Sequence, residues 1–324
     1  MLLESDNPII KPSYHVQKFT SMDGYIWDQF ISKSKNATFL FKRDFIEYHN
    51  DRFEDYSLMI FNKETLMAVF PGHLKDNTFY SHLGLSYGGI VCDSKNTEII
   101  EEIFEAIIAY LKELKIRSVY IKMLPIFLRE GYHSAIEYFI FKRGGILVRR
   151  DLNFIIDFSK KIEIHKSKQK KIKRKENSLT ILPEKNFKIF WEQILIPTLK
   201  ETYNTQPVHS LAEIEYLGGK FPDNILHYNV YYKNEIVAGM TLFVDKGVVK
   251  SQYGAANLAG KEARALDVLY LALFEKYNAD GFRYFDLGTT TIDGGYQYNK
   301  GLTRYKEELG AYSVNLDHYS INLL

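Results

Sequence analysis

Apolar and polar positions follow the same order of elements twice along the chain. In the first half, alternating apolar residues predict strands over residues 56–61 and 65–72, a polar turn between them, and a third strand-like segment over 78–91. Residues 98–115 then carry apolar side chains at intervals of three and four, which predicts an amphipathic helix. A strand over 117–123 closes this first set of elements.

The second half repeats this order. Strands are predicted over residues 225–232, 236–244 and 248–256, a helix over 260–277, and a strand over 282–288. The turns after the first strand of each half, Asn62-Lys63-Glu64 and Lys233-Asn234-Glu235, are also similar. Because such a repeat indicates duplicated structural units, we predict an α/β protein with mixed sheets in two tandem domains.

A strongly basic segment, residues 159–177, separates the two halves and lacks an apolar stripe. A strand over 178–184 and a helix over 187–203 follow it, so the junction is placed near residue 160. This gives an N-terminal domain of residues 1–160 and a C-terminal domain of residues 161–324, which begins with a basic linker helix over 161–177. A second arrangement stays open, in which the last strand, 311–324, packs back on the first domain and the two are not separable.

Composition narrows the class of protein. Of the 324 residues, 46% are hydrophobic, and 42 Lys and Arg nearly balance 40 Asp and Glu, so a sizeable core is expected, no DNA-binding function is indicated, and any basic site is local. The single cysteine, Cys92, excludes an intrachain disulfide. With no signal-peptide pattern and no apolar run of about 20 residues, we expect a cytoplasmic protein without an integral membrane segment.

The closing stretch, residues 282–312, carries most of the candidate chemistry. A hydrophobic strand leads into a polar, glycine-rich loop over 289–295 and then into an amphipathic helix with several cations. Open α/β sheets bind ligands at the carboxyl ends of their strands, so this order predicts a binding site. Lys306, with Arg304 close to it, can stabilise the oxyanion of a tetrahedral intermediate, although each cation taken alone is more commonly a solvated surface residue.

Asp286 ends the strand in an apolar context. Such a carboxylate can accept a proton from an ammonium nucleophile, or it can cap the following loop. The hydroxyls of Thr289 and Thr290 can orient a sugar or a phosphate, while an ordinary loop is the simpler interpretation. Tyr253 and Gly254 lie where a ligand can approach the backbone, and a plain turn explains them equally well.

Part of the basic segment forms a cationic face if it is helical. Lys170, Lys173 and Arg174 belong to it, and they can bind a diphosphate, a tRNA backbone or acidic lipid headgroups. A solvated linker helix is equally consistent with a run of charges. The segment contains no aromatic residue for base stacking, which argues against recognition of single-stranded nucleic acid.

Other kinds of site lack their motifs. The nine histidines are scattered and form no metal-binding pair, so a metal site is not expected. Neither GxxxxGKS/T nor GxGxxG occurs, which leaves nucleotide hydrolysis and dinucleotide redox chemistry without support.

The layout resembles that of the FemAB-related acyltransferases, which pair two GNAT-type (N-acetyltransferase) folds in one chain. Three segments carry the resemblance: KKIKRKENSLTIL at 170–182, NVYYKNEIVAGMTLFVDKGVVKSQYGAA at 229–256, and the terminal block FDLGTT…YNKGLTRYKEELGA. In the terminal block, Asp286, Gly288, Lys306, Gly310 and Ala311 fall on the family pattern. The likeness extends from about residue 35 to residue 315.

The resemblance implies transfer of an acyl or aminoacyl group to an amine, with Lys306 near the transferred carbonyl and the basic segment against phosphates of the acceptor or donor. The implied donor is an acyl-CoA such as acetyl-CoA, or an aminoacyl-tRNA, and no metal is implied. The chain lacks the Arg/Gln-x-x-Gly-x-Gly/Ala pyrophosphate loop of simple GNAT enzymes. It also lacks the coiled-coil insertion of some tRNA-dependent members, so the donor stays open.

The expected function is that of a cytoplasmic N-acyltransferase acting on an amine of a phosphate-bearing acceptor, for instance a nucleotide-linked amino sugar of surface-polysaccharide or cell-envelope synthesis. Lys306, Asp286 and Tyr305 are the expected catalytic residues, with Tyr253, Tyr296 or Tyr305 as proton donor to the leaving group. The expected substrate-binding residues are Lys170, Lys173, Arg174, Tyr253, Gly254, Thr289, Thr290, Tyr296 and Arg304. Two alternatives are kept: an aminoacyl-tRNA-dependent transferase acting on a peptidoglycan precursor, and a nonenzymatic adaptor that binds RNA or a membrane through the basic helix.

Overall fold

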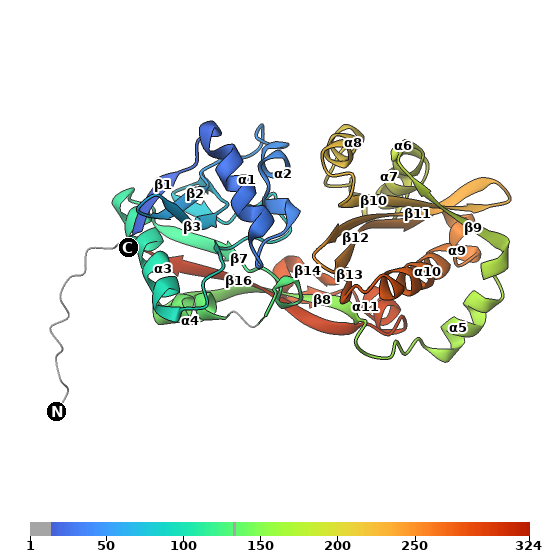
Figure 1. Ribbon diagram of the computed structural model, residues 1–324. Coiled ribbons are helices and arrows are strands. Elements are labelled where there is room, and N and C mark those ends of the chain that lie inside the picture. The colour runs from blue at the N-terminus through green and yellow to red at the C-terminus, as the bar shows by residue number, and fades with distance from the viewer. Residues whose placement is uncertain (1–13, 132–133) are drawn as a thin grey trace, which may run out of the picture. The chain divides into compact units, whose positions relative to one another are not determined.

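The computed structural model describes residues 14–131 and 134–324 (Figure 1). The N-terminal segment, on which the expected absence of a signal peptide rests, lies outside the described residues. The chain forms two compact units: unit 1 holds the residues up to Val148 together with Asp317–Leu324, and unit 2 holds Arg149–Leu316. Both combine helices with strands in mixed arrangements, which confirms the predicted fold class.

The units divide within a single strand, β8 (Ile146–Asp157), earlier in the chain than the junction expected near residue 160. The chain returns to unit 1 in β16 (Tyr312–Asn322), whose residues from His318 onward pair antiparallel with β7 (Ser118–Lys122). The end of the chain therefore packs on the first unit, which is the second arrangement that the sequence left open.

Unit 1 has an antiparallel sheet in the order β1-β2-β3-β6 and a second group in which β4, β5 and β7 adjoin the end of β16. Its strands are β1 (Tyr14–Lys18), β2 (Leu58–Asn62), β3 (Thr65–Phe70), β4 (His73–Lys75), β5 (Thr78–Tyr80), β6 (Val91–Cys92) and β7. Its helices are α1 (Gly24–Lys33), α2 (Arg43–Glu47), α3 (Thr97–Glu113) and α4 (Ala135–Lys142), with short 3-10 helices at Ser21–Asp23, Phe39–Phe41 and Ile126–Leu128.

The single strand predicted over residues 78–91 is wrong. Its two ends form β5 and β6, which belong to different groups of strands, and residues 81–90 leave the sheet. The chain folds back so closely here that a Cβ on Gly88 would lie 2.1 Å from the Ser81 carbonyl oxygen. This close approach depends on contacts that the local pattern of apolar residues does not contain.

Helix α3 forms where the sequence predicts a helix over 98–115. Asn96 caps it, since its side chain accepts hydrogen bonds from the backbone N–H groups of Glu98 and Ile99. The apolar stripe of the helix is buried in the unit 1 core with residues of β1, β2, β3 and β7. Lys115 takes a left-handed φ of 59° just beyond the helix and ends it.

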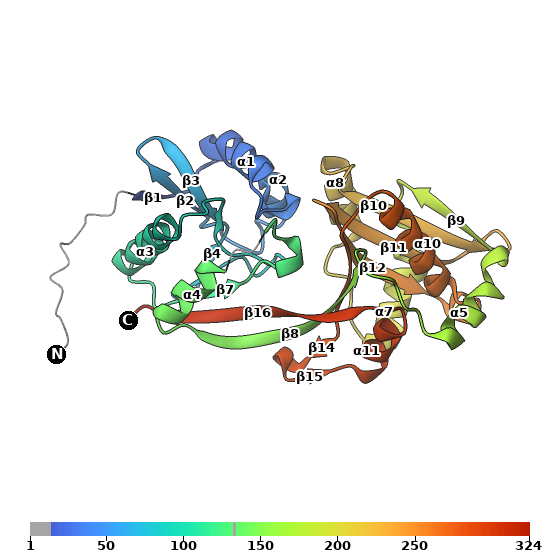
Figure 2. The ribbon, with the colours of Figure 1, turned by 60° about the horizontal axis from the view of Figure 1, so that its bottom comes forward.

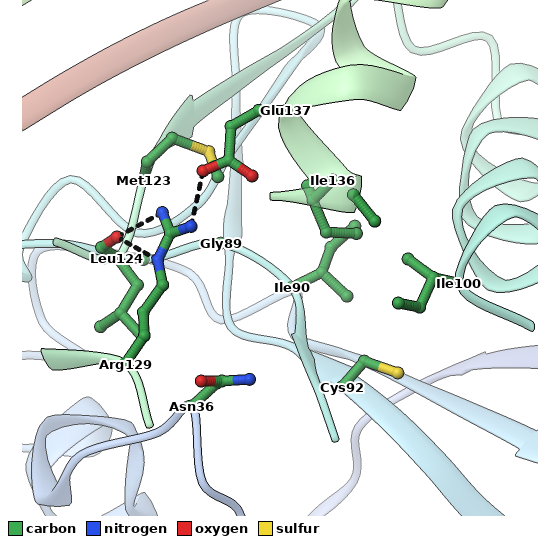
Figure 3. Close-up of a pocket in the computed structure, with 12 residues that line it drawn as sticks. Asn36, Gly89, Ile90, Cys92, Ile100, Met123, Leu124, Arg129, Ile136 and Glu137 are labelled. Carbon is green, nitrogen blue, oxygen red and sulfur yellow. Dashed lines mark hydrogen bonds and ion pairs between the residues drawn. The ribbon is translucent and has the colours of Figure 1, made fainter. Parts of the chain in front are cut away.

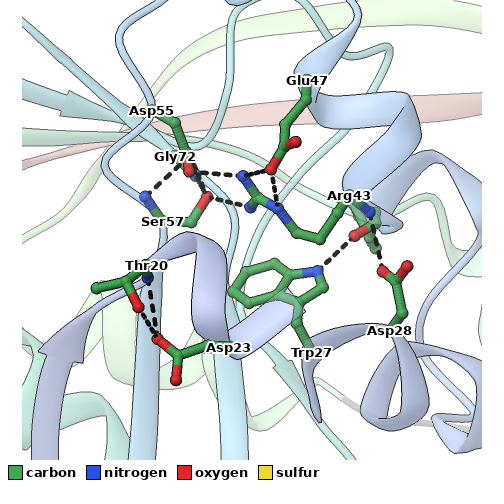
Figure 4. A network of polar contacts seen from close by, with 10 residues as sticks. Thr20, Asp23, Trp27, Asp28, Arg43, Glu47, Asp55, Ser57 and Gly72 are labelled. Atoms are coloured by element: carbon green, nitrogen blue, oxygen red, sulfur yellow. Dashed lines mark hydrogen bonds and ion pairs between the residues drawn. The ribbon is translucent and has the colours of Figure 1, made fainter. Parts of the chain in front are cut away.

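A buried arginine ties α2 to the start of the unit 1 sheet (Figure 4). Arg43 donates to Glu47 at 2.9 Å and to Asp55 at 2.7 Å, and its guanidinium carbon lies 3.6 Å from the centre of the Phe19 ring. Asp55 also accepts from the Ser57 hydroxyl, just before β2. Because removing one partner would leave a buried charge unpaired, we assign this network a structural role.

Unit 2 has one sheet in the order β8-β13-β12-β11-β10-β9, in which β12 and β13 are parallel and the other neighbours are antiparallel. Its further strands are β9 (Leu179–Glu184), β10 (Ile225–Tyr232), β11 (Glu235–Asp245), β12 (Val248–Ala256) and β13 (Tyr284–Thr289), with a hairpin of β14 (Thr291–Ile292) and β15 (Gln297–Tyr298). Its helices are α5 (Lys166–Lys173), α6 (Lys188–Phe190), a π-helical turn (Trp191–Leu195), α7 (Ile196–Tyr203), α8 (Leu211–Lys220), α9 (Leu258–Glu262), α10 (Ala265–Ala279) and α11 (Lys300–Glu307), with 3-10 helices at Glu176–Ser178 and Asp293–Gly295.

Helices cover both faces of the unit 2 sheet, with α6, α7 and α8 on one side and α10 on the other (Figure 1). β11 is buried along nearly its whole length, as a continuous apolar strand covered on both faces must be. α9 lies directly against β11, since a Cβ on Gly260 would come within 2.1 Å of the Val237 carbonyl oxygen. The single helix predicted over 260–277 is instead α9 followed by α10, because Arg264 takes a left-handed φ of 60° between them.

After β13 the chain forms the β14–β15 hairpin and then α11, which lie close together (Figure 2). Asn299 caps α11 by accepting from the backbone N–H of Leu302. Thr303 on α11 donates to the Thr290 hydroxyl at 3.0 Å. These contacts hold α11 against the end of β13, where the sequence predicted a binding site.

Candidate functional site

The unit 2 sheet opens between β12 and β13. These parallel strands pair only over Val248–Lys250 and Tyr284–Asp286. β12 continues to Ala256 beside β11, and no strand in the described part of the chain pairs with its other edge beyond Lys250. We call the opening between residues 250–256 and residues 286–289 the fork. Its free backbone edge can pair with an extended chain of amide groups.

Both strands of the fork carry a β-bulge. The ladder between β11 and β12 skips Gln252, and the ladder between β8 and β13 skips Leu287, so each is an extra residue in its strand. A bulge changes the direction in which the following side chains point, and bulges are frequent beside active sites. The fork is therefore bounded on both sides by irregularities that redirect side chains.

Asp286 lies buried where the fork begins. One of its oxygens accepts from Asn153 Nδ2 and from the Gly288 N–H, each at 2.8 Å, and the other is 3.0 Å from Lys250 Nζ. Gly288 has a left-handed φ of 79°, which favours glycine. The sequence left two roles open for Asp286, proton acceptor and cap of the following loop. The hydrogen bond from the Gly288 N–H is a contact of the capping kind.

Lys306 reaches the fork from α11. Its ammonium donates to the carbonyl oxygens of Gly288 at 2.8 Å and Thr289 at 3.0 Å, and the residue is buried. Burial is the main cause that lowers its pKa to about 8, while the Asp286 carboxylate acts in the opposite direction. A lysine ammonium has three donors, so one N–H remains for a ligand. The structure thus brings Lys306 together with Asp286, through the turn at Gly288.

The opposite wall of the fork carries hydroxyl groups. Ser251 Oγ and Tyr270 OH lie 3.2 Å apart, and burial raises the pKa of Tyr270 to about 12. A Cβ on Gly254 would lie 3.6 Å from Ser251 Oγ and 3.8 Å from Tyr270 OH. Gly254 is exposed, so it leaves the backbone open beside both hydroxyls.

Tyr253 points to the other face of the sheet. Its hydroxyl lies 2.5 Å from His209 Nδ1 and accepts from the His209 N–H at 3.1 Å, and burial raises its pKa to about 12. In a regular strand, Ser251 and Tyr253 would share a face, but the bulge at Gln252 turns them to opposite faces. The structure therefore does not bring Tyr253 together with Lys306.

Tyr305 also has partners of its own. Its ring centre lies 3.9 Å from Lys168 Nζ, and Lys168 pairs with Asp267 at 3.0 Å. Burial, followed by the nearby Asp267 carboxylate, raises the pKa of Tyr305 well above its usual value. Arg264 and Glu308 complete this cluster of charges, so Tyr305 faces α5 and α10 rather than the Lys306 ammonium.

The predicted residues of the loop and of α11 differ in exposure. Thr289 is exposed and its carbonyl accepts from Lys306, whereas Thr290 is buried and accepts from Thr303. Tyr296 is 87% exposed, and Arg304 is exposed on α11. Thr290 therefore supports α11 from inside, while Tyr296 and Arg304 are open to a ligand from solvent.

The basic segment forms α5, and one side of this helix is anchored in unit 2. Lys168 and Ile172 are buried, and Lys168 is fixed by the ion pair with Asp267 on α10. Lys170, Lys173 and Arg174 are exposed. The cationic face thus points to solvent from a helix held by a buried ion pair, and this arrangement is compatible with both interpretations of the segment.

Sequence reasoning missed Lys250, Ser251, Asn153 and Tyr270, which surround the fork. Lys250 and Ser251 are polar residues in the apolar pattern of β12, and Asn153 is a polar residue in that of β8. These interruptions could have identified the three residues from the sequence. Tyr270 carried no signal, because it fits the apolar pattern of α10.

Unit 1 has a cavity between the ends of β6 and β7 and the starts of α3 and α4 (Figure 3). In the repeated order of elements, β7 of unit 1 corresponds to β13, which borders the fork in unit 2. Its volume is about 50 Å³. Arg129 donates to the Leu124 carbonyl just beyond β7, and Glu137 on α4 pairs with it at 2.6 Å. The rest of the lining is largely apolar: Ile90, Cys92, Ile100, Met123 and Ile136.

Two other kinds of feature are absent from the described residues. No helix of the described residues is long and apolar enough to span a membrane. Within residues 14–131 and 134–324, no group of three or more His, Cys, Asp or Glu side chains is placed to hold a metal ion.

Part of the chain matches a known family. Residues 201–307, which include the fork and α11, match the family model of an acetyltransferase (GNAT) domain. A search of curated proteins finds no match. Among solved structures, the chain is similar to FemX, with a TM-score of 0.68 and 12% identity over 95% of this chain and 97% of that one. It is also similar to L-PGS from Bacillus licheniformis, with a TM-score of 0.54 and 10% identity over 79% and 81% of the two chains.

At 12% identity the likeness to FemX shows the fold alone. The match of residues 201–307 shows that the fork lies in an acetyltransferase domain. The resemblance predicted from the sequence motifs is confirmed: residues 201–307 form an acetyltransferase (GNAT) domain, and the chain has the fold of FemX.

Proposed function

We propose that the protein transfers an acyl group to an amine of a phosphate-bearing acceptor, for instance a nucleotide-linked amino sugar used in the cell envelope. The observation that carries the proposal is the buried Lys306 ammonium at the end of β13, beside a fork between two parallel strands. In a site of low dielectric, such a cation stabilises negative charge that develops on an attacked carbonyl oxygen. The match of residues 201–307 to an acetyltransferase domain supports the same chemistry.

In the proposed reaction the neutral amine attacks the acyl carbonyl directly. A C–N bond forms, the C–S bond of a thioester or the C–O bond of an ester breaks, and the proton of the amine passes to the leaving group. Lys306 stabilises the oxyanion, and Asp286 positions Gly288 and Lys250 around it. Tyr270 is the tyrosine that lies beside the fork, and its raised pKa keeps it protonated, so we assign it the donation of a proton to the leaving group.

We propose an acyl-CoA as the donor, because the fork offers a free backbone edge to a narrow chain that carries amide groups. An aminoacyl-tRNA is the second candidate. The anchored, cationic α5 supports it, since Lys170, Lys173 and Arg174 are free to meet phosphates at the surface. A cytoplasmic location is part of the proposal, because both donors are made there.

A transfer assay with the purified full chain tests the proposal. Acetyl-CoA and charged tRNA are offered separately with UDP- or dTDP-linked amino sugars and with a peptidoglycan precursor, and mass spectrometry detects the N-acylated product. Product from acetyl-CoA supports the acyl-CoA donor, and product from charged tRNA alone moves the donor to the second candidate. If no combination gives product while RNA or anionic vesicles bind in a salt-sensitive manner, the adaptor alternative replaces the proposal.

A further inference from the structure

Unit 2 also has a cavity. It lies at the β9–β10 side of the sheet, and β11 separates it from the fork. Its volume is about 540 Å³, within the range of small-molecule sites, about 300–1,000 Å³. The lining comes from the end of β9, the last turns of α8 and the first residues of β10. It shares no residue with the fork.

The inner wall of this cavity is apolar and neutral. Phe187 and Ile225 supply apolar side chains on the face of β10 that also carries His227. His227 also lines it, and its two ring nitrogens already have partners, at 3.0 Å on the Thr241 hydroxyl and 2.8 Å on the Asn229 side-chain oxygen. Burial lowers the pKa of His227 to about 4, so this ring stays uncharged at neutral pH. The wall therefore suits a flat or chain-like apolar body.

The rim of the cavity is rich in acceptors. Glu184 and Glu215 contribute carboxylates, against the single ammonium of Lys185. The end of α8 adds backbone carbonyls. In a helix the carbonyl of Gly218 would accept from the N–H four residues later, but that residue is Pro222, which has no N–H. The C-terminal end of a helix also carries partial negative charge. The group that complements this rim is a cation with several N–H donors.

Two glycines at the end of α8 shape the cavity. A Cβ on Gly218 would come within 2.8 Å of the Phe187 ring, so glycine lets the helix end lie directly on the aromatic wall. A Cβ on Gly219 would meet no atom within 4 Å, so this glycine faces open space. A large side chain at Gly219 can therefore fill the cavity without disturbing the helix.

From this geometry we propose that the cavity binds an organic cation, a molecule with a flat or chain-like apolar body and a primary ammonium group. The body lies against Phe187 and Ile225, and the ammonium faces Glu184, Glu215 and the end of α8. The site is additional to the fork, and the argument for it does not depend on the transfer reaction.

Calorimetric titration of the full chain with phenethylamine tests the proposal, with phenethyl alcohol as the uncharged counterpart. We expect the amine to bind and the alcohol to bind at least tenfold more weakly. Gly219→Leu should abolish binding of the amine, and leucine favours helix over glycine, so the variant should remain folded. The matched control is Gly24→Leu in α1 of unit 1, another helical glycine with no atom within 4 Å of its Cβ position, which should bind as the wild type does.

Two further variants locate the charge and the site. Replacing both carboxylates, with Glu184→Gln and Glu215→Gln, should remove the preference for the amine over the alcohol. Lys306→Met should leave binding unchanged, and loss of binding there would place the probe in the fork and overturn the assignment. The proposal is also overturned if the amine does not bind, if the alcohol binds equally well, or if Gly219→Leu binds with wild-type affinity.

Discussion

In each unit a cationic side chain donates to carbonyl groups just after a strand. The two cations differ in whether a carboxylate is paired with them. In unit 1, Arg129 donates to the Leu124 carbonyl just after β7, and Glu137 on the next helix neutralises it at 2.6 Å. In unit 2, Lys306 donates to the carbonyls of Gly288 and Thr289 at the end of β13. No ion pair joins Lys306 to a carboxylate in the part of the chain that the structure describes.

The difference shows that two units with the same order of elements can hold cations with different charge partners. Arginine remains charged in proteins, and the carboxylate of Glu137 already compensates Arg129. Lysine changes its charge readily when it is buried, and burial lowers the pKa of Lys306 to about 8. In both units the cation reaches carbonyls just after a strand, and only the cation of unit 1 is paired with a carboxylate.

The largest effect is expected for Lys306→Met. Loss of one oxyanion donor should lower kcat by about 10²–10³-fold. The measurement is the rate of N-acyl product formation, with circular dichroism to confirm that the variant is folded. Lys300→Met, an exposed lysine on the same helix, is the matched control and should keep wild-type activity. A loss of less than tenfold for Lys306→Met would remove the proposed role of its ammonium.

In unit 1 the equivalent change should affect stability and not the chemistry. Arg129→Met leaves Glu137 without its partner, so the free energy of unfolding should fall by about 3 kcal/mol. Urea denaturation measures this change, and kcat per folded molecule should stay at the wild-type value. The double variant Arg129→Met/Glu137→Leu should recover most of the loss, because both partners are then apolar. A large fall in kcat for Arg129→Met would mean that unit 1 takes part in the reaction.

The pH dependence of activity distinguishes the two possible uses of Lys306. If its protonated form stabilises the oxyanion, activity should fall by roughly tenfold per pH unit above a pKa of about 8. Lys306→Arg should remove this fall, since arginine stays protonated. A rate that instead rises through pH 8 in the wild type, but not in Lys306→Met, would show that the neutral lysine acts as a base.

A smaller effect is expected from the buried histidines of unit 1. Burial lowers the pKa of His82 to about 2 and that of His73 to about 4, so both are neutral in the fold while the unfolded chain takes up protons near pH 6.5. Stability should therefore fall as the pH drops below about 6.5. His82→Asn suits the left-handed φ of 65° at this position, and the variant should lose about 2 kcal/mol less stability than wild type between pH 7 and pH 5. Equal pH slopes in urea denaturation would contradict this account.

Elements that depend on local periodicity were predictable. The duplicated order, the helix α3 and the strand β13 followed by a loop and a helix all follow from residue types within one segment. The strand predicted over 78–91 and the helix predicted over 260–277 failed, because the close approach at Gly88 and the left-handed Arg264 are set by packing against other segments.

The candidate site was predictable only in part. Lys306 and Asp286 lie together, as the terminal block suggested, but Tyr305 faces a different cluster. Successive residues of a helix point about 100° apart, so Lys306 and Tyr305 cannot both face the fork. Tyr253 turns away for another reason, the extra residue Gln252 in its strand.

By itself, the sequence determined the α/β class, the tandem order of elements and the position of a cation-bearing helix after a strand, because each is contained in the spacing of residues along one segment. The tertiary structure alone decided which groups meet at the fork. Asp286, Lys250, Asn153 and Lys306 come from three strands and one helix, and the sheet brings them within hydrogen-bonding distance of one another or of the same turn. The charge of Lys306 is likewise a tertiary property, because a pKa depends on burial and on neighbours that no local pattern contains.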